Sequence, residues 1–421
     1  MMSRRSLQQK LSLALVLLLT LAMLSGTEGS QAAPQNQDAD APRSTAPRDF
    51  TTRNFIMHTD LPEDEAREEL EKLETMLGLI SAYWGRASNA PIEMYVVRDL
   101  KNWPEDSLHP TGLAKIKGRA GVTISQKITS GNRFISKAVV YAVAERGVAR
   151  HEAVHAYCHQ AFGTVGPVWY SEGMAEMGQY WVKDDLSVNA HEVVIDYLQE
   201  SDPRPVAEIV DDAEKNSQTG DSWQSYAWRW ALCHVLEVNP NYRRKFRTLG
   251  LNYLSGRKIP FDNVFGQEMD QLDFEYRFFL EHLDKGFRVD LCAWDWSKRF
   301  TLVSGRRTLT SRISADRGWQ PSMAQLRQGE TYTVTATGNW KLAKDGDQIP
   351  PSGDEQGKGK LQGVLLTEGY QLTEPFDIGA EATFTAKTDG RLYFRCADDW
   401  SELEDNSGRI AVKTTLAANA K

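Results

Sequence analysis

The stretch HEAVHAYCHQAFGTVGPVWYSEGMAE, residues 151–176, decides the fold around it, because it predicts two helices joined by a short loop. His151 and His155 are four residues apart, so on a helix their imidazoles lie on one face, close enough to share one ion. Gly163 is expected to end that helix, and a second helix is expected to begin near Ser171. Glu172 would then lie at its start and reach back to the two imidazoles.

Two imidazoles and one carboxylate are typical of catalytic zinc sites, in which the fourth position stays open. The sequence therefore predicts zinc held by His151, His155 and Glu172. Glu152 is expected to act as the base that takes a proton from the metal-bound water, without being a ligand. Glu176, one turn after Glu172, is expected to accept the free ring N–H of a ligand histidine and so fix its orientation.

These helices resemble the gluzincin metallopeptidases, and more closely the peptidase MA-like families of exported bacterial proteins. The resemblance lies in His151–His155 (HEAVH) and Trp169–Glu176 (WYSEGMAE), and it extends from about Phe55 to Phe287. It implies the same three zinc ligands and the same base. Sixteen residues separate His155 from Glu172, somewhat fewer than in the aminopeptidase N branch. Because the chain contains no Gly-x-Met-Glu-Asn exopeptidase motif, an endopeptidase is predicted.

A hydrogen-bond donor for the developing oxyanion commonly comes, in gluzincins, from a helix after the third ligand. Tyr226 and His234 lie in that part of the chain, and Tyr226 is the predicted catalytic donor. A second interpretation stays open, in which Tyr226, Trp230 and His234, spaced by four, form a packed helix face.

The composition, 421 residues with a formal net charge of −8 and 41% hydrophobic residues, is typical of a multi-domain globular protein. It gives no basic surface for nucleic acid, so nucleic acid is not a predicted partner. Basic residues before the apolar run 11–24 predict a signal peptide over 1–32 and export to the periplasm, cell surface or medium. Residues 33–53, poor in large apolar side chains, predict a disordered linker. No later stretch is long and apolar enough to span a membrane after signal removal.

The predicted fold class is α+β. Strand-like runs at 55–57, 92–97, 122–124 and 138–142, with a helix over 61–84, predict a small mixed sheet. Mainly helices follow, with helical periodicity at 149–162, 191–199, 223–238, 241–253 and 273–283. Together these elements predict a gluzincin-like metallopeptidase domain over residues 54–288.

The remainder, residues 289–421, predicts an all-β sandwich domain, because short alternating runs are separated by Gly, Asp and Pro. Gly338–Trp340, Gly390–Tyr393 and Asp405–Gly408 resemble the PA-I galactophilic lectin-like domain, whose calcium ion bridges protein and sugar. The resemblance implies calcium ligands at Asp398, Asp405 and Asn406, and carbohydrate as a partner. An acidic loop held by an Asx turn, without calcium, stays open as the alternative.

The function predicted from these patterns is that of an exported zinc-dependent endopeptidase acting on a peptide or protein, with a C-terminal domain that targets glycans or a surface. The alternative is a non-catalytic surface carbohydrate-binding protein that keeps the peptidase fold as a scaffold. A third interpretation is a zinc hydrolase acting on a non-peptide amide, such as a cell-wall linkage.

Overall fold

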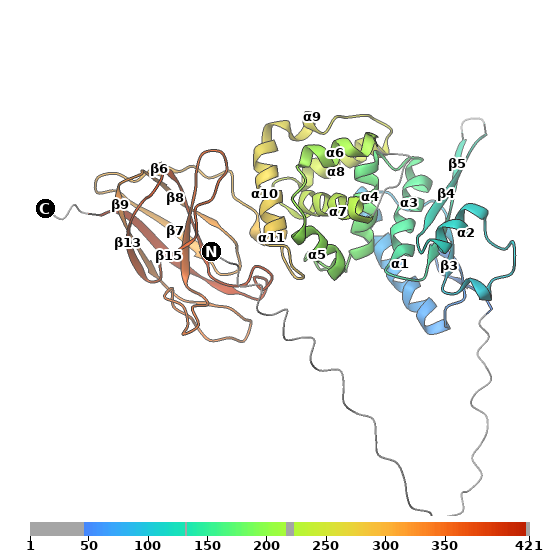
Figure 1. Cartoon of the computed structure of the whole chain (residues 1–421), viewed down its shortest axis with the longest axis horizontal. Helices are drawn as coiled ribbons and strands as arrows, with labels where there is room; N and C mark the ends of the chain where they lie inside the picture. The colour runs from blue at the N-terminus through green and yellow to red at the C-terminus, as the bar shows by residue number, and fades with distance from the viewer. Residues whose placement is uncertain (1–45, 131–132, 216–222, 418–421) are drawn as a thin grey trace, which may run out of the picture. The chain divides into compact units, whose positions relative to one another are not determined.

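The first sheet has five strands in the order β1-β2-β3-β5-β4. Strands β3, β4 and β5 are labelled in Figure 1. The computed structural model describes residues 46–130, 133–215 and 223–417. β2, β3 and β5 run parallel, whereas β1 and β4 are antiparallel to their neighbours, so the sheet is mixed, as predicted. The strands are β1 (Arg48–Thr51), β2 (Phe55–Thr59), β3 (Ile92–Val97), β4 (Val122–Ser130) and β5 (Arg133–Val143).

Strand β1 corrects the prediction of a disordered linker over residues 33–53. Residues 48–51 pair with β2, and Phe50, the one large apolar residue of that segment, is buried in the main core. The pairing of β1 with the next strand is thus not revealed by the polar composition of the segment. The predicted signal peptide, 1–32, and the start of the linker lie outside the described residues.

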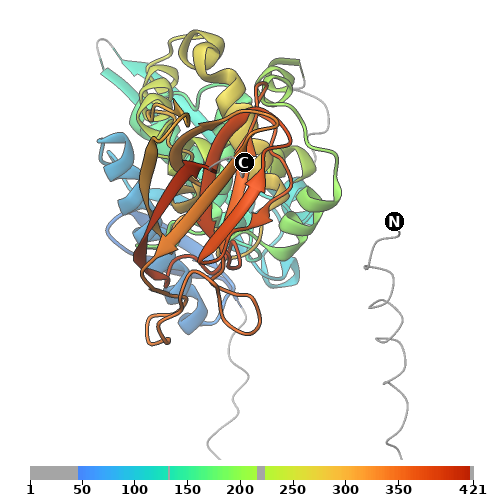
Figure 2. The same cartoon turned by 90° about the vertical axis from the view of Figure 1, so that its left-hand side faces the viewer.

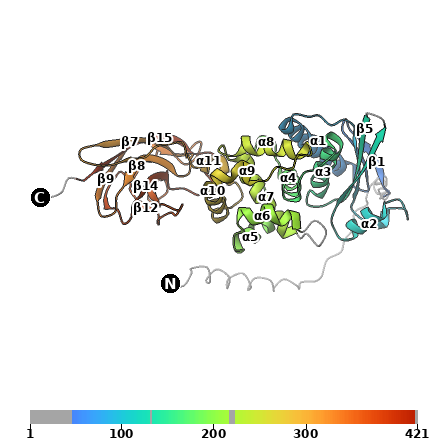
Figure 3. The same ribbon diagram turned by 90° about the horizontal axis from the view of Figure 1, so that it is seen from above.

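The two faces of the sheet pack against different helices, because side chains alternate along each strand. In β5, Ala138, Val140 and Ala142 belong to the core that contains α1 (Glu63–Trp84) and α3 (Val148–Phe162). Tyr141 and Val143 point to the other face, toward α2 (Pro110–Lys117). Figure 3 shows α1 and α3 beside these strands. Helix α3, which carries both histidines, therefore lies directly on the sheet.

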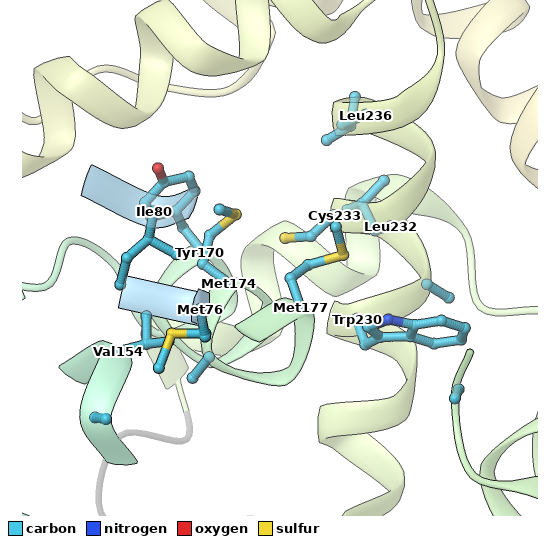
Figure 4. Close-up of a cluster of buried hydrophobic side chains, with 14 of the residues drawn as sticks. Met76, Ile80, Val154, Tyr170, Met174, Met177, Trp230, Leu232, Cys233 and Leu236 are labelled. Carbon is cyan, nitrogen blue, oxygen red and sulfur yellow. The ribbon is translucent and has the colours of Figure 1, made fainter. Parts of the chain in front are cut away.

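The helices that follow α3 bury apolar side chains around α4 and α7, including Met174 and Cys233 (Figure 4). The predicted helices are present, whereas α2, α6, α9 and α11 were not predicted. Helix α4 begins at Val168, not near Ser171, so Glu172 lies in its second turn. The helices are α4 (Val168–Tyr180), α5 (Glu192–Glu200), α6 (Val206–Lys215), α7 (Trp223–Val238), α8 (Arg243–Leu254), α9 (Asp262–Phe265), α10 (Met269–Glu281) and α11 (Val289–Cys292), with 3₁₀ turns η2 (Leu100–Asn102) and η3 (Gly266–Glu268).

Two further sheets follow Cys292, drawn from orange to red in Figure 2. One has the order β10-β15-β9-β13, with β7 also paired to β15; the other has the order β12-β11-β14-β8-β6. They share one hydrophobic core, as in a β-sandwich. The strands are β6 (Thr301–Leu302), β7 (Thr308–Ser314), β8 (Gln320–Leu326), β9 (Thr331–Thr337), β10 (Trp340–Lys341), β11 (Leu361–Leu366), β12 (Phe376–Asp377), β13 (Glu381–Thr385), β14 (Gly390–Cys396) and β15 (Ser407–Leu416).

The chain is thus a mixed α+β protein with one helix-covered sheet and two sheets that share a second core. All four cysteines are free and buried. Among the described helices, none combines the length and apolar character needed to cross a membrane.

Candidate metal centre

Helices α3 and α4 pack closely, and two glycines of α4 make this packing feasible. A Cβ at Gly178 would lie 2.4 Å from Cγ2 of Val154 on α3. A Cβ at Gly173 would lie 2.7 Å from the backbone oxygen of Arg229 on α7. Helix α3 ends at Gly163, whose φ of 78° only glycine adopts readily. These features fix α4 between α3 and α7 and aim its carboxylates at the histidines.

The predicted ligand trio lies together at this packing contact. The Nε2 atoms of His151 and His155 are 3.2 Å apart. Oε2 of Glu172 lies 3.3 Å from Nε2 of His151 and 3.4 Å from Nε2 of His155. Among the described residues, this trio is the one group of three or more His, Cys, Asp or Glu side chains with the spacing to hold a metal ion.

The spacing of these three atoms fits zinc. Ligand atoms about 2.0–2.1 Å from a tetrahedral zinc ion lie about 3.3 Å from one another. The three observed separations, 3.2, 3.3 and 3.4 Å, match the edges of such a tetrahedron. The donor set therefore fits a divalent ion that accepts imidazole and carboxylate, and it leaves a fourth position open.

Each imidazole is oriented by a partner on α4. Nδ1 of His151 lies 3.1 Å from Oε1 of Glu176, as the sequence led us to expect. Nδ1 of His155 lies 3.2 Å from Oγ of Ser171, a partner that was not predicted. Because Nδ1 is engaged in each ring, Nε2 of each ring faces Glu172, which is the arrangement that partners of metal-bound histidines produce.

The electrostatics of the trio favour a cation. Burial lowers the pKa of His151, but the hydrogen bonds with Glu172 and Glu176 outweigh it and raise that pKa well above its ordinary value. Burial raises the pKa of Glu172, but the charges and hydrogen bonds of His155 and His151 outweigh it and hold the pKa far below its usual range. Glu172 therefore stays ionised, and the site attracts positive charge.

Glu152 is buried beside the trio, and a residue of the sheet, Thr123 in β4, contacts its carboxylate. The hydroxyl of Thr123 lies 2.9 Å from Oε2 and 2.8 Å from the backbone oxygen of Glu152. Gly121 leaves the space that the carboxylate occupies, since a Cβ there would lie 2.6 Å from Cγ of Glu152. Neither Thr123 nor Gly121 was predicted, because both precede α3 by a whole strand and reach the site only through the fold.

The three candidates on α7 have different surroundings. Tyr226 is partly buried, and its ring centre lies 5.9 Å from that of His151. His234 is buried against Trp230 and Phe279, and burial lowers its pKa to about 4. The structure thus brings Tyr226 to the candidate metal centre, whereas Trp230 and His234 belong to the core.

A cavity of about 790 Å³ contains the trio, Glu152 and Tyr226. Its walls come from the start of β4, from α3 and α4, and from the N-terminal parts of α5 and α7. Within the described chain, β4 pairs with β5 alone, so its other edge is open. Val122 and Thr123, at the start of β4, line the cavity.

The predicted calcium loop is only partly assembled. The side-chain amide of Asn406 donates to Oδ2 of Asp398 over 3.0 Å, so these two residues meet. Oδ1 of Asp398 and Oδ1 of Asn406 are buried and accept no hydrogen bond within the described chain, although Nζ of Lys358 lies 3.4 Å from Oδ1 of Asp398. Asp405 is exposed.

Comparisons with known proteins give weak structural likenesses. No family model matches the chain, and no curated protein matches it. The N-terminal domain of EclA, a PllA-like lectin, is 19% identical over 26% of this chain and 96% of that domain, with a TM-score of 0.21. The periplasmic g-type lysozyme inhibitor PliG of Aeromonas hydrophila is 9% identical over 28% of this chain and 99% of that protein, with a TM-score of 0.17.

The metallopeptidase IMPa of Pseudomonas aeruginosa is similar to a longer part of the chain. The identity is 12% over 53% of this chain and 23% of IMPa, with a TM-score of 0.18. A structure of IMPa with an O-glycopeptide gives 13% identity over the same shares and a TM-score of 0.17. Because every TM-score lies far below 0.5, these likenesses assign neither a family nor a function to the chain.

Proposed function

We propose that this chain is an exported zinc-dependent metallopeptidase, and specifically an endopeptidase, that hydrolyses peptide bonds. The observation that carries the proposal is the tetrahedral spacing of three donor atoms, from His151, His155 and Glu172, with both imidazoles oriented by α4. A structural zinc site would use four protein ligands, whereas this trio opens into a large cavity.

When bound, zinc would supply Lewis-acid chemistry: it would make a water molecule more acidic and polarise the substrate carbonyl, so that the carbonyl carbon is more readily attacked. Glu152, which Thr123 holds beside the trio, takes up the proton of the attacking water. Glu152 then returns that proton to the amine nitrogen that leaves the cleaved peptide bond. Tyr226, on the cavity wall, would donate a hydrogen bond to the developing oxyanion.

A peptide substrate is supported by the open edge of β4. An extended peptide that adds to this edge forms main-chain hydrogen bonds with β4, and its side chains then enter the cavity alternately. Val122 and Thr123, at the start of this strand, line the cavity, so a peptide paired there would lie beside the trio and could continue in both directions. An endopeptidase is therefore the form of the activity that we propose.

The decisive variant is Glu152→Gln in the full mature chain, tested on a peptide library with and without a chelator. Cleavage should fall by roughly 10²–10⁴-fold while zinc stays bound, because Glu152 moves the proton but does not hold the ion. Glu71→Gln, on the exposed side of α1, removes a carboxylate elsewhere and should leave cleavage unchanged. Wild-type protein that binds zinc yet cleaves nothing sensitive to a chelator would contradict the proposal.

The second candidate function, a carbohydrate-binding protein, has one observation in its favour. Oδ1 of Asp398 and Oδ1 of Asn406, which are buried and accept no hydrogen bond within the described chain, suit a calcium ion, and we propose that calcium and a glycan bind at this loop in place of the Lys358 ammonium group. If the sandwich alone performed the function, sugar retention would need calcium, survive Glu152→Gln, and occur without any peptidase activity. Asn406→Leu should abolish calcium-dependent retention; retention unchanged by this variant and by chelator would contradict calcium binding.

A further inference from the structure

A second cavity, of about 450 Å³, lies in the C-terminal part of the chain and is unrelated to the metal centre. Four basic side chains from separate segments line it: Lys298 before β6, Arg312 in β7, Arg317 after β7 and Arg409 in β15. One acidic side chain, Asp295, lines it as well. The lining thus carries a net charge of about three positive units in a chain whose formal charge is −8.

Most of this positive charge is not neutralised within the described chain. Nζ of Lys298 lies 3.5 Å from Asp295. Arg317 donates to the backbone oxygen of Asp290, and Nε of Arg409 donates to Oγ of Ser314, which leaves the terminal nitrogens of Arg409 unused. Arg312 is exposed and makes no ion pair or hydrogen bond with any described side chain. Three guanidinium groups are therefore available to a ligand.

One wall of the cavity, formed by β8, departs from regular strand geometry. Met323 lines the cavity with a φ of 69°, in a region of backbone space that a side chain rarely adopts. The pairing of β8 with β14 shifts register there, between Arg391 and Tyr393, so β8 carries a bulge. Bulges and strained residues concentrate where a strand shapes a binding surface.

We propose that this cavity binds an acidic sugar, one that carries a sulfate, phosphate or carboxylate group. The guanidinium groups of Arg312 and Arg409 offer paired N–H donors to an oxyanion. Thr310 and Ser311 offer hydroxyl groups at the same cavity, and Trp319 and Met323 add apolar surface. A sugar ring with an acidic substituent uses all three kinds of contact. The site is independent of the proposed peptidase activity and of the loop at Asp398.

Calorimetric titration of the full mature chain tests this proposal. The probes are a sulfated heparin-derived disaccharide, an unsulfated uronate disaccharide, a phosphorylated hexose and neutral maltose, each at low and physiological salt. At least one acidic probe should bind with saturation and weaken with salt, whereas maltose should not bind. The three acidic arms distinguish sulfate, carboxylate and phosphate, and a chelator should change none of them.

Arg312→Gln should weaken the best probe by roughly tenfold or more, since a charged hydrogen bond is lost. This variant should fold normally, because Arg312 is exposed and holds no other described side chain. Arg307→Gln removes the same charge just before β7, outside the cavity, and should leave affinity unchanged. Equal weakening by the two variants, saturable binding of maltose, or no binding of any acidic probe would overturn the proposal. If Arg312→Gln keeps the peptidase activity of the wild type, its weaker sugar binding cannot be due to damage at the candidate metal centre.

Discussion

At the residue scale, the proposed role of Glu152 as a base depends on the space around its carboxylate. Gly121 has an ordinary backbone conformation, so its value lies in the missing Cβ, which would lie 2.6 Å from Cγ of Glu152. Gly121→Ala should therefore displace Glu152 and lower kcat by about tenfold or more, with zinc content unchanged. Steady-state kinetics and elemental analysis check this together.

Gly78→Ala is the control for that substitution. A Cβ at Gly78, in α1, meets nothing within 4 Å, so the added methyl group should leave kcat unchanged. Equal activity of the Gly121 and Gly78 variants would show that Glu152 tolerates the methyl group and would contradict its role as a confined base.

The hydroxyl of Thr123 provides a second prediction at this scale. Thr123→Val keeps the shape of the side chain but removes the donor 2.9 Å from Oε2 of Glu152. We expect kcat to fall by roughly tenfold, the cost of one hydrogen bond to a charged group, whereas Thr123→Ser should retain most activity. If both variants matched the wild type, Thr123 would have no part in positioning Glu152.

The sequence predicted which helix residues of the candidate metal centre lie together, because local spacing determines this part of the arrangement. His151 and His155 lie one turn apart on one helix, and Glu172 and Glu176 lie one turn apart on the next. Thr123 lies in β4 and Gly121 directly precedes this strand, so the spacing of residues within the helices does not predict that they contact Glu152. The contact of Ser171 with His155 was not predicted, although Ser171 lies beside Glu172 on the same helix.

At the element scale, the position of α4 determines whether the carboxylates reach the histidines. Gly173 lies against backbone of α7, which cannot move aside as a flexible side chain would. Gly173→Ala should separate α4 from α7, lower the free energy of unfolding by roughly 1–3 kcal/mol, and weaken zinc binding. Thermal unfolding and zinc titration measure both effects; a variant with unchanged stability and unchanged zinc affinity would show that this close packing is dispensable.

Element boundaries were predictable where a local signal exists. Gly163 ends α3 as expected, and the five helices with clear periodicity are present. The start of α4 was placed too late, although Pro167 directly before Val168 is a usual residue at a helix start. β1 was missed because its segment is polar apart from Phe50. β7 was missed because its partner, β15, lies far later in the chain.

At the scale of the whole molecule, stability should depend on pH through Glu275 of α10. This buried carboxylate accepts hydrogen bonds from Asn239, Asn241, Tyr242 and Trp296, yet burial outweighs them and raises its pKa from 4.5 to about 7. The folded protein therefore holds the proton more tightly than the unfolded chain. Its contribution to stability is fully present below pH 4.5 and is lost as the pH rises through 7, by about 3 kcal/mol in total.

The measurement is the free energy of unfolding between pH 4.5 and 8 for the wild type and for Glu275→Gln. The variant cannot titrate at this position. As the pH rises from 4.5 to 8, its free energy of unfolding should therefore decrease less than that of the wild type. Equal slopes would show that another group controls the pH dependence.

The α+β class was predictable, because helical and alternating periodicities occupy different parts of the chain. The predicted boundary at residue 289 was too early, because α11 (Val289–Cys292) is helical, belongs to the first core and precedes the strands, which begin at Thr301. The basic cavity was not predictable, since Lys298, Arg312, Arg317 and Arg409 are dispersed in sequence and meet only through strand pairing. A site built from separate segments depends on how the strands pair, and the pattern of one sequence does not define this pairing.

The central claim is that His151, His155 and Glu172 hold one zinc ion, and metal content tests it most directly. Elemental analysis of the purified mature chain, the Glu172→Gln variant and the Glu152→Gln variant is the measurement. We predict about one zinc ion per chain in the wild type and in Glu152→Gln, and strongly reduced zinc in Glu172→Gln. Wild-type protein without zinc after exposure to the ion, or full zinc content in Glu172→Gln, would contradict the account.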